Sequence, residues 1–136
     1  MAIFQAFRAL RPVSEKAADV AALPYDVVDR AEAKAIGDKN PDSFLHVDRA
    51  EMDLPDDTDL YDSEVYERAR QNLLNMEKNG VMKQDETPCY YIYELTRKGK
   101  TQTGLVGCCS IDDYMKGIVK NMNLPEKIRS RTVSVM

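Results

Sequence analysis

The stretch EVYERARQNLLNMEKNG, from Glu64 to Gly80, carries the clearest helical pattern in the chain. Four apolar residues recur on one face at helical spacing: Val65, Ala69, Leu73 and Met76. Asp62 or Ser63 can cap the start of this helix, and Gly80 can stop it. The opposite face is charged, so the pattern predicts that it faces solvent.

A β-hairpin is predicted soon after this helix. The segments CYYIYELT and TQTGLVGCCSI, residues 89–96 and 101–111, are rich in Tyr, Ile, Val and Thr, and the turn RKGK joins them. The tyrosines of the first segment are interpreted as packing against a helix, because no basic residues interleave with them as a nucleic-acid surface requires. The segment DDYMKGIV then turns out of the sheet, and Asp112 can cap it. Together these patterns predict an α+β fold with helices packed on a small, largely antiparallel sheet.

The first half of the chain is expected to add shorter elements. RPVSEKAADVAAL can form a short helix, and a D-x-x-E capping box predicts a second one from Arg30 to Gly37, with Gly37 at its C′ position. SFLHV, from Ser43 to Val47, is predicted as a short buried strand. The acidic segment DRAEMDLPDDTDLYDS, residues 48–63, is predicted as an extended surface loop.

The composition indicates a soluble globular protein. The chain has 136 residues, of which 43% are hydrophobic and 31% charged, a length and balance that predict one compact unit. No apolar run approaches the roughly 20 residues that a membrane helix needs, and the N-terminus lacks the pattern of a secretory signal. We therefore expect a cytoplasmic protein with no membrane partner.

Cysteine and charge exclude further classes. Cys89, Cys108 and Cys109 form no C-x-x-C pair, so neither a zinc site nor a disulfide framework is predicted. Adjacent Cys108 and Cys109 are interpreted as buried core residues rather than reactive thiols. The net charge is −4, divided into −6 for residues 1–120 and +2 for residues 121–136. An acidic body argues against nucleic-acid binding, because phosphate contacts need a clustered basic face.

Two places could carry chemistry. His46 is the only histidine, and Arg49 and Glu51 fall just beyond the end of its predicted strand, where ligand groups collect. The alternative, which the residues alone favour, is a buried histidine whose ring nitrogens bond to backbone. In LPYDVV, Tyr25 and Asp26 could bring a hydroxyl and a carboxylate to a site, or the segment could simply build a turn. The sequence contains no Walker loop, dinucleotide fingerprint or nucleophile elbow.

Six motifs, in order, resemble the N-terminal part of a family of bacterial and archaeal proteins, the domain of unknown function family 1015. They are LPYDVV, NPDSFLHVDRAEMDLP, YDSEVYERARQNL, GVMKQDETPCYYIYELT, QTGLVGCCSIDDY and GIVK. The resemblance runs from about Phe7 to Lys120. The chain departs from the family pattern at Leu23, where a proline is usual, and at Asp42 and Ala50, where an aromatic residue and a proline are usual.

The resemblance implies an enzyme of small-molecule metabolism. The family is similar to ParB-like proteins that include free-serine kinases, which suggests phosphoryl transfer to free serine, with carboxylates for proton abstraction and cations for phosphate. On this view the candidate catalytic residues are Asp26, His46, Arg49 and Glu51, and the candidate ligand-binding residues are Tyr25 and Ser43. The alternative is a binding or regulatory module without turnover. The enzyme hypothesis needs the four catalytic candidates to converge on one cleft.

The final segment, KNMNLPEKIRSRTVSVM from Lys120, departs from the family. Relatives continue with a segment of the form K-H-E-x-T-R-x-D-K-E-x-D-R-x-R-H. One added base in a run of A converts an allowed coding sequence of this tail into KKHEFTREDKEQDRIRH, which fits that form. We therefore interpret residues 1–120 as the N-terminal portion of the family domain and residues 121–136 as a frameshifted tail. A truncated chain is expected to be inactive alone and, because apolar surface is left uncovered, to form a homo-oligomer.

Overall fold

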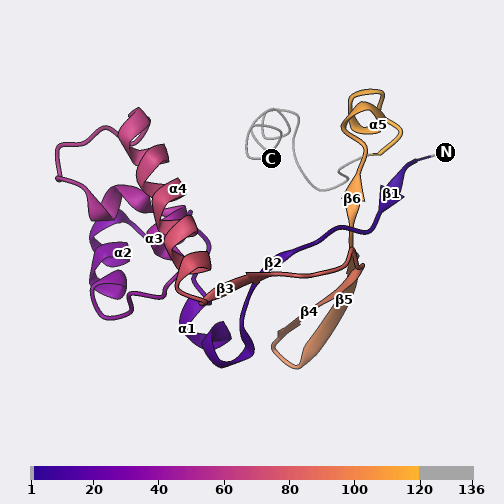
Figure 1. Ribbon diagram of the computed structural model, residues 1–136, viewed down its shortest axis with the longest axis horizontal. Coiled ribbons are helices and arrows are strands. Elements are labelled where there is room, and N and C mark those ends of the chain that lie inside the picture. The colour runs from indigo at the N-terminus through magenta and orange to yellow at the C-terminus, as the bar shows by residue number, and fades with distance from the viewer. Residues whose placement is uncertain (1, 120–136) are drawn as a thin grey trace. The chain divides into compact units, whose positions relative to one another are not determined.

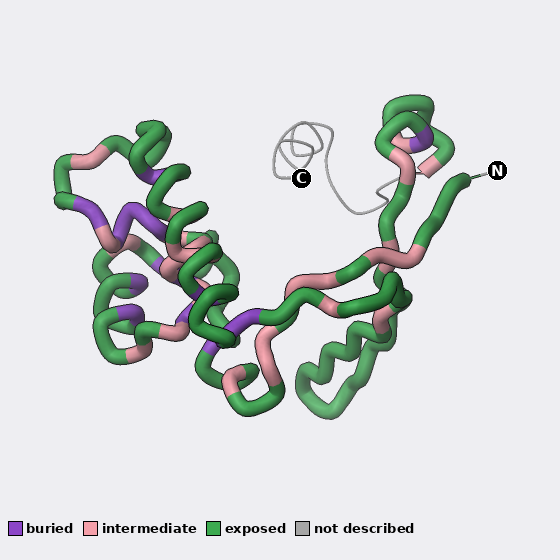
Figure 2. Tube along the Cα trace, in the orientation of Figure 1, coloured by how far each residue is buried: buried purple, intermediate pink, exposed green. Residues whose placement is uncertain are grey.

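The computed structural model describes residues 2–119. Where the sequence predicts one compact unit, these residues form two (Figure 1). The helical unit comprises Leu10–Asp85, and the strand unit comprises the described residues before and after it, 2–9 and 86–119. All of the buried apolar residues among those described belong to the helical unit (Figure 2). The division therefore follows the distribution of the hydrophobic core.

The helical unit contains short helices around one long one. Its elements, in order, are β2 (Leu10–Pro12), the 3₁₀ turn η1 (Ser14–Lys16), α1 (Ala17–Val20), α2 (Arg30–Gly37), α3 (Leu45–Asp48), the 3₁₀ turn η2 (Ala50–Asp53), α4 (Ser63–Lys78) and β3 (Met82–Gln84). Strands β2 and β3 pair antiparallel, with Leu10 opposite Gln84 and Pro12 opposite Met82. This ladder closes the unit, because it joins the first residues of the unit to the last.

The long helix α4 forms as its pattern predicts. The Asp62 carboxylate accepts a hydrogen bond from the Glu64 N–H at 3.0 Å, which caps the N-terminus. Val65 and Met76 are buried on the apolar face. Gly80 follows the helix with φ +73°, the left-handed conformation that glycine adopts readily.

Helix α2 confirms its capping box but corrects the role of Gly37. The Asp29 carboxylate accepts from the Glu32 N–H at 2.8 Å, and the Glu32 carboxylate accepts from the Asp29 N–H at 3.1 Å. Gly37 is the last helical residue and is not left-handed. A Cβ at this position would overlap the Met52 methyl group and lie 3.2 Å from two ring atoms of His46. Close packing against these two side chains therefore explains the glycine.

The predicted strand from Ser43 to Val47 is wrong, because this segment is helical. Asp48 N–H donates to Phe44 O at 3.0 Å, and Arg49 N–H donates to Leu45 O at 2.8 Å. Ser43 is 2% exposed, and its hydroxyl accepts from the Leu45 N–H at the start of the turn. A run of five residues is too short for its hydrophobic pattern to separate a buried strand from a buried helical turn.

The predicted surface loop is wrong in its first half. Residues 50–53 form η2, and four residues of this part are buried: Ala50, Glu51, Met52 and Leu54. Leu45, Ala33 and Met52 pack in one cluster with Val28, whereas Ala50 and Leu54 pack with Val65 of α4. The segment is therefore part of the core. It was predicted as a surface loop because of its many acidic residues, although apolar residues lie between them.

The strand unit consists of short antiparallel pairs and one helix. Its elements are β1 (Phe4–Gln5), β4 (Tyr91–Arg97), β5 (Lys100–Val106), β6 (Cys108–Cys109) and α5 (Ile111–Met115). Strand β1 pairs with β6, and β4 pairs with β5 through a turn in which Lys98 and Gly99 have φ +51° and +73°. The predicted hairpin and the α+β fold class are thus confirmed. All of the described sheets are two-stranded and antiparallel.

Other expectations for the strand unit need correction. Cys108 and Cys109 are exposed rather than buried, and both are free, as is Cys89. Ser110, and not Asp112, caps α5, because its hydroxyl accepts from the Asp113 N–H at 3.3 Å. Tyr90 stacks on Phe4 of β1 at 5.4 Å between ring centroids, so it packs on the N-terminal strand rather than on a helix. The Tyr90–Phe4 contact joins residues far apart in sequence, which local patterns do not specify.

Across residues 2–119, none of the helices combines the length and the apolar character that crossing a membrane requires.

Candidate functional site

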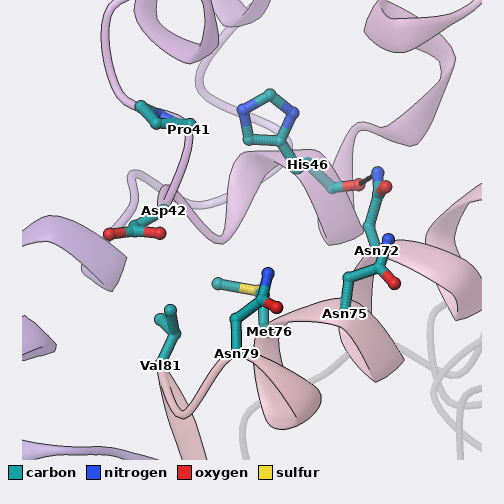
Figure 3. A pocket seen from close by; sticks show the side chains of 8 residues that line it. All are labelled: Pro41, Asp42, His46, Asn72, Asn75, Met76, Asn79 and Val81. Carbon is teal, nitrogen blue, oxygen red and sulfur yellow. Dashed lines mark hydrogen bonds between the residues drawn. The ribbon is translucent and has the colours of Figure 1, made fainter.

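A pocket of about 170 Å³ lies within the helical unit (Figure 3). It lies between the turn before α3, α3 itself, the second half of α4 and the start of the following strand. The described residues that line it are Pro41, Asp42, His46, Asn72, Asn75, Met76, Asn79 and Val81.

Three asparagines of α4 and its C-cap form one wall of the pocket. Asn72, Asn75 and Asn79 are spaced i, i+3 and i+7, which places them on one helix face. Asn72 Nδ2 donates to His46 O at 2.7 Å, the bond drawn in Figure 3, and to Asp53 Oδ2 at 2.8 Å. Sequence reasoning missed this wall. The available signal was two asparagines inside a helix, where this residue is disfavoured unless its side chain has a role.

His46 and Asp53 form a hydrogen-bonded pair beside the pocket. His46 Nδ1 lies 2.9 and 3.0 Å from the two carboxylate oxygens of Asp53, so Nδ1 carries the proton and donates it. His46 Nε2 is buried and has no hydrogen-bond partner among the described residues. The imidazole is therefore bound to a carboxylate rather than to backbone. Asp53 is a site residue that the sequence analysis did not identify.

Arg49 and Glu51 contact each other instead of His46. Arg49 Nε lies 2.8 Å from Glu51 Oε1, and Glu51 is only 5% exposed. Arg49 Nη1 also donates to the backbone carbonyl of Tyr25 at 3.3 Å. The structure thus brings together Arg49, Glu51 and the backbone of the predicted turn.

The remaining sequence candidates lie outside the pocket wall. The side chains of Tyr25 and Asp26 are exposed in the turn before α2. Ser43 is buried, and its hydroxyl accepts from the Leu45 N–H just before α3. Of the six candidates, His46 alone belongs to the described lining of this pocket.

The carboxylate of the described pocket lining, Asp42, is paired with a lysine. Lys16 Nζ lies 2.7 Å from Asp42 Oδ2, and this hydrogen bond, with the charge of Asp42, raises the pKa of Lys16. Desolvation by the surrounding protein raises the pKa of Asp48, at the end of α3. Among residues 2–119, no group of three or more His, Cys, Asp or Glu side chains is arranged to hold a metal ion. The pocket therefore offers amide groups, one carboxylate and one imidazole.

Comparison with known proteins identifies the family. The sequence model of the family described as "Protein of unknown function (DUF1015)" matches residues 4–125. No curated protein and no solved structure matches the chain. The matched region ends past Lys120, and the expectations for the tail, residues 121–136, lie outside the described residues. Because the match covers most of its length, the chain belongs to the DUF1015 family.

Proposed function

We propose that this DUF1015 protein takes part in small-molecule metabolism, and that the pocket binds a small hydroxyl compound from which His46 accepts a proton. The observation that carries the proposal is the imidazole held by Asp53 at Nδ1, with Nε2 left without a partner among residues 2–119. The reaction that we favour is phosphoryl transfer from a nucleotide or pyrophosphate donor to the hydroxyl of free serine: the serine oxygen bonds to the terminal phosphorus, the bond from that phosphorus to the bridging oxygen breaks, and the rest of the donor leaves.

The His46–Asp53 pair has the requirements of a general base. A carboxylate that accepts from Nδ1–H fixes the tautomer in which Nε2 has a free lone pair, and it stabilises the cation formed when Nε2 gains a proton. Asn72 donates to the same carboxylate and limits its rotation. Nε2 is covered by protein and packs close to Gly37, which is not part of the pocket lining, so a substrate hydroxyl in the pocket reaches it only after the imidazole ring turns away from this glycine.

The size and polarity of the pocket support a ligand as small as an amino acid. A cavity of ~150 Å³ accepts benzene, so a pocket of about 170 Å³ suits roughly six or seven non-hydrogen atoms. Asn75 and Asn79 supply carboxamide donors and acceptors, and the Asp42 carboxylate, one oxygen of which bonds to Lys16, can accept a further hydrogen bond from an ammonium group. Serine carries a hydroxyl, a carboxylate and an ammonium group, which these side chains complement.

The same wall is a poor site for the phosphate donor. Its described lining contains neither Arg nor Lys, whereas bound phosphates usually need cationic partners. Arg49 is engaged with Glu51 in an ion pair outside the lining. We therefore assign the pocket to the acceptor molecule and not to the phosphate.

A binding module without turnover is the second candidate. The observation in its favour is that Nε2 has almost no exposed surface and that Arg49 and Glu51 are paired away from His46. In this case the pocket would bind the same class of ligand without a proton transfer.

Calorimetric titration with L-serine, L-alanine and O-phosphoserine tests the proposal. We expect saturable binding of serine, weaker binding of alanine because it lacks the hydroxyl, and loss of binding in Asn75→Ala. Glu77→Ala, an exposed substitution on the same helix, should bind serine as the unmodified chain does. Equal binding of serine by both variants, or none by the unmodified chain, would contradict the assignment of the pocket. Transfer of labelled phosphate to serine by a longer member of the family, lost when the histidine that matches His46 is replaced, would separate the enzyme from the binding module.

A further inference from the structure

Arg30 binds five backbone carbonyls in one segment of the helical unit. Its Nη1 donates to the carbonyls of Asp56 and Thr58 at 3.0 and 3.3 Å. Its Nη2 donates to those of Glu51, Leu54 and Pro55 at 2.6, 3.1 and 2.7 Å. The segment from Glu51 to Thr58 therefore bends around a single guanidinium group.

This arrangement requires arginine. The two Nη atoms carry four N–H groups, which are shared among the five carbonyls, and their planar geometry spreads the donors over a wide arc. A lysine ammonium has three donors at one point and cannot reach the same set. The segment is also acidic, so the positive charge of Arg30 offsets repulsion among its carboxylates.

Asp53 lies between two of the carbonyls that Arg30 binds. Glu51 and Leu54 flank it, and the Leu54 N–H also donates to Glu51 O at 3.2 Å. Arg30 thus fixes the backbone on both sides of the residue whose carboxylate bonds to His46 Nδ1. Arg30 lies 16 positions before His46 in the sequence, and no local sequence pattern links the two.

We propose that Arg30 is a positioning residue that acts on His46 through Asp53. Any role of Arg30 in catalysis rests on the function proposed above. Its effect on the tautomer of His46 can be measured without any ligand. Without Arg30, the segment from Leu54 to Thr58 loses its common partner and Asp53 is no longer held at one place. The imidazole then loses the bond that selects its Nδ1–H tautomer.

The single histidine gives a direct test, because ¹⁵N NMR of the imidazole reports one residue. In the unmodified chain we expect the Nδ1–H tautomer of His46 to dominate over the Nε2–H tautomer in the neutral ring. Arg30→Lys and Arg30→Ala should both shift the spectrum toward a mixture of tautomers, with the larger change in Arg30→Ala. Lys34→Ala is the control, since Lys34 lies on the same helix and pairs only with the exposed Asp38 among its described contacts.

Chemical rescue separates positioning from general damage. Guanidinium ion, at concentrations far below those that unfold proteins, should restore the tautomer in Arg30→Ala but have no effect on Asp53→Ala. A folded Arg30→Lys or Arg30→Ala chain with an unchanged His46 spectrum would overturn the proposal, as would a change that Lys34→Ala reproduces. If serine fails to bind while these spectra behave as expected, the proposed function fails and the positioning role stands.

Discussion

His46 Nδ1 lies 2.9 Å from Asp53 Oδ1, and the two residues are seven positions apart. The bond joins the end of η2 to the one-turn helix α3 across the bend at Arg49 and Ala50. Both side chains are about one-fifth exposed, at 19% and 22%, so the bond is partly shielded from water. It links the only histidine of the chain to the pocket and to the segment held by Arg30.

Replacing Asp53 should destabilise the helical unit. Asp53→Ala leaves His46 Nδ1 and one Asn72 N–H without their acceptor, and hydrogen bonds to a charged group contribute about 1.5–3 kcal/mol. Urea unfolding followed by circular dichroism should show a loss in this range. Asp57→Ala, an exposed substitution in the same acidic segment, should change the free energy of unfolding much less. Equal losses in the two variants would contradict a specific role for Asp53.

A methyl group at Gly37 should also be costly. The Cβ of Gly37→Ala would overlap the Met52 side chain and press on the His46 ring, and overpacking of this kind costs about 1–3 kcal/mol. Gly104→Ala is the matched control, because its Cβ would meet only the Tyr93 carbonyl oxygen, at 3.9 Å. The midpoint of thermal unfolding should be lower for the Gly37 variant than for the Gly104 variant. The reverse order would show that the Met52 and His46 side chains move aside without loss of stability.

Asp48 gives the stability of the protein a pH dependence. Burial raises the pKa of its carboxyl in the folded state above the ordinary value of 3.8. The group therefore contributes stability that is fully present below pH 3.8 and is lost as the pH rises through the folded-state pKa. Because much of the side chain still contacts solvent, we expect only a small effect.

The uncharged variant Asp48→Asn removes the pH-dependent contribution of this carboxyl to stability. Its midpoint of thermal unfolding, relative to the unmodified chain, should be higher at pH 7 than at pH 4. Asp57→Asn, in which an exposed carboxylate is replaced, serves as the control. A difference between variant and unmodified chain that does not change with pH would rule out a contribution from Asp48.

The hairpin is expected to associate with that of a second copy. Ile92 and Leu105 lie opposite each other and are 70% and 59% exposed. Among the described residues, the outer edges of β4 and β5 have no strand beside them, and an unpaired edge can pair with its own copy. Light scattering after gel filtration should therefore give a dimer or a larger species.

A charge on the apolar surface should dissociate that assembly. Leu105→Lys is expected to yield a monomer. Thr103→Lys is the control: it lies on the same face of β5, but its charge is placed at a position that is already polar, so the assembly should remain. Monomeric unmodified protein at micromolar concentration would contradict the prediction, and so would a dimer that survives Leu105→Lys.

The structure explains which parts of the fold were predictable. Helix α4, the capping box of α2 and the β4–β5 hairpin were predicted because each depends on interactions between near neighbours. The strand predicted from Ser43 to Val47 was wrong, since a short apolar run is compatible with two conformations until its neighbours are placed. The exposure of Cys108 and Cys109 was missed for the same reason: burial depends on what the rest of the chain covers.

For the candidate site, the sequence by itself determined one residue of the pocket wall, His46, because histidine is a residue type that commonly accepts and donates protons at functional sites. Only the tertiary structure decided that its partner is Asp53 and not Arg49 or Glu51, that Asn72 donates to the same carboxylate, and that Arg30 binds the backbone on both sides of Asp53. Caps, turns and helix faces are encoded within about four residues of sequence. A hydrogen bond between side chains of different elements exists only after packing brings those elements together.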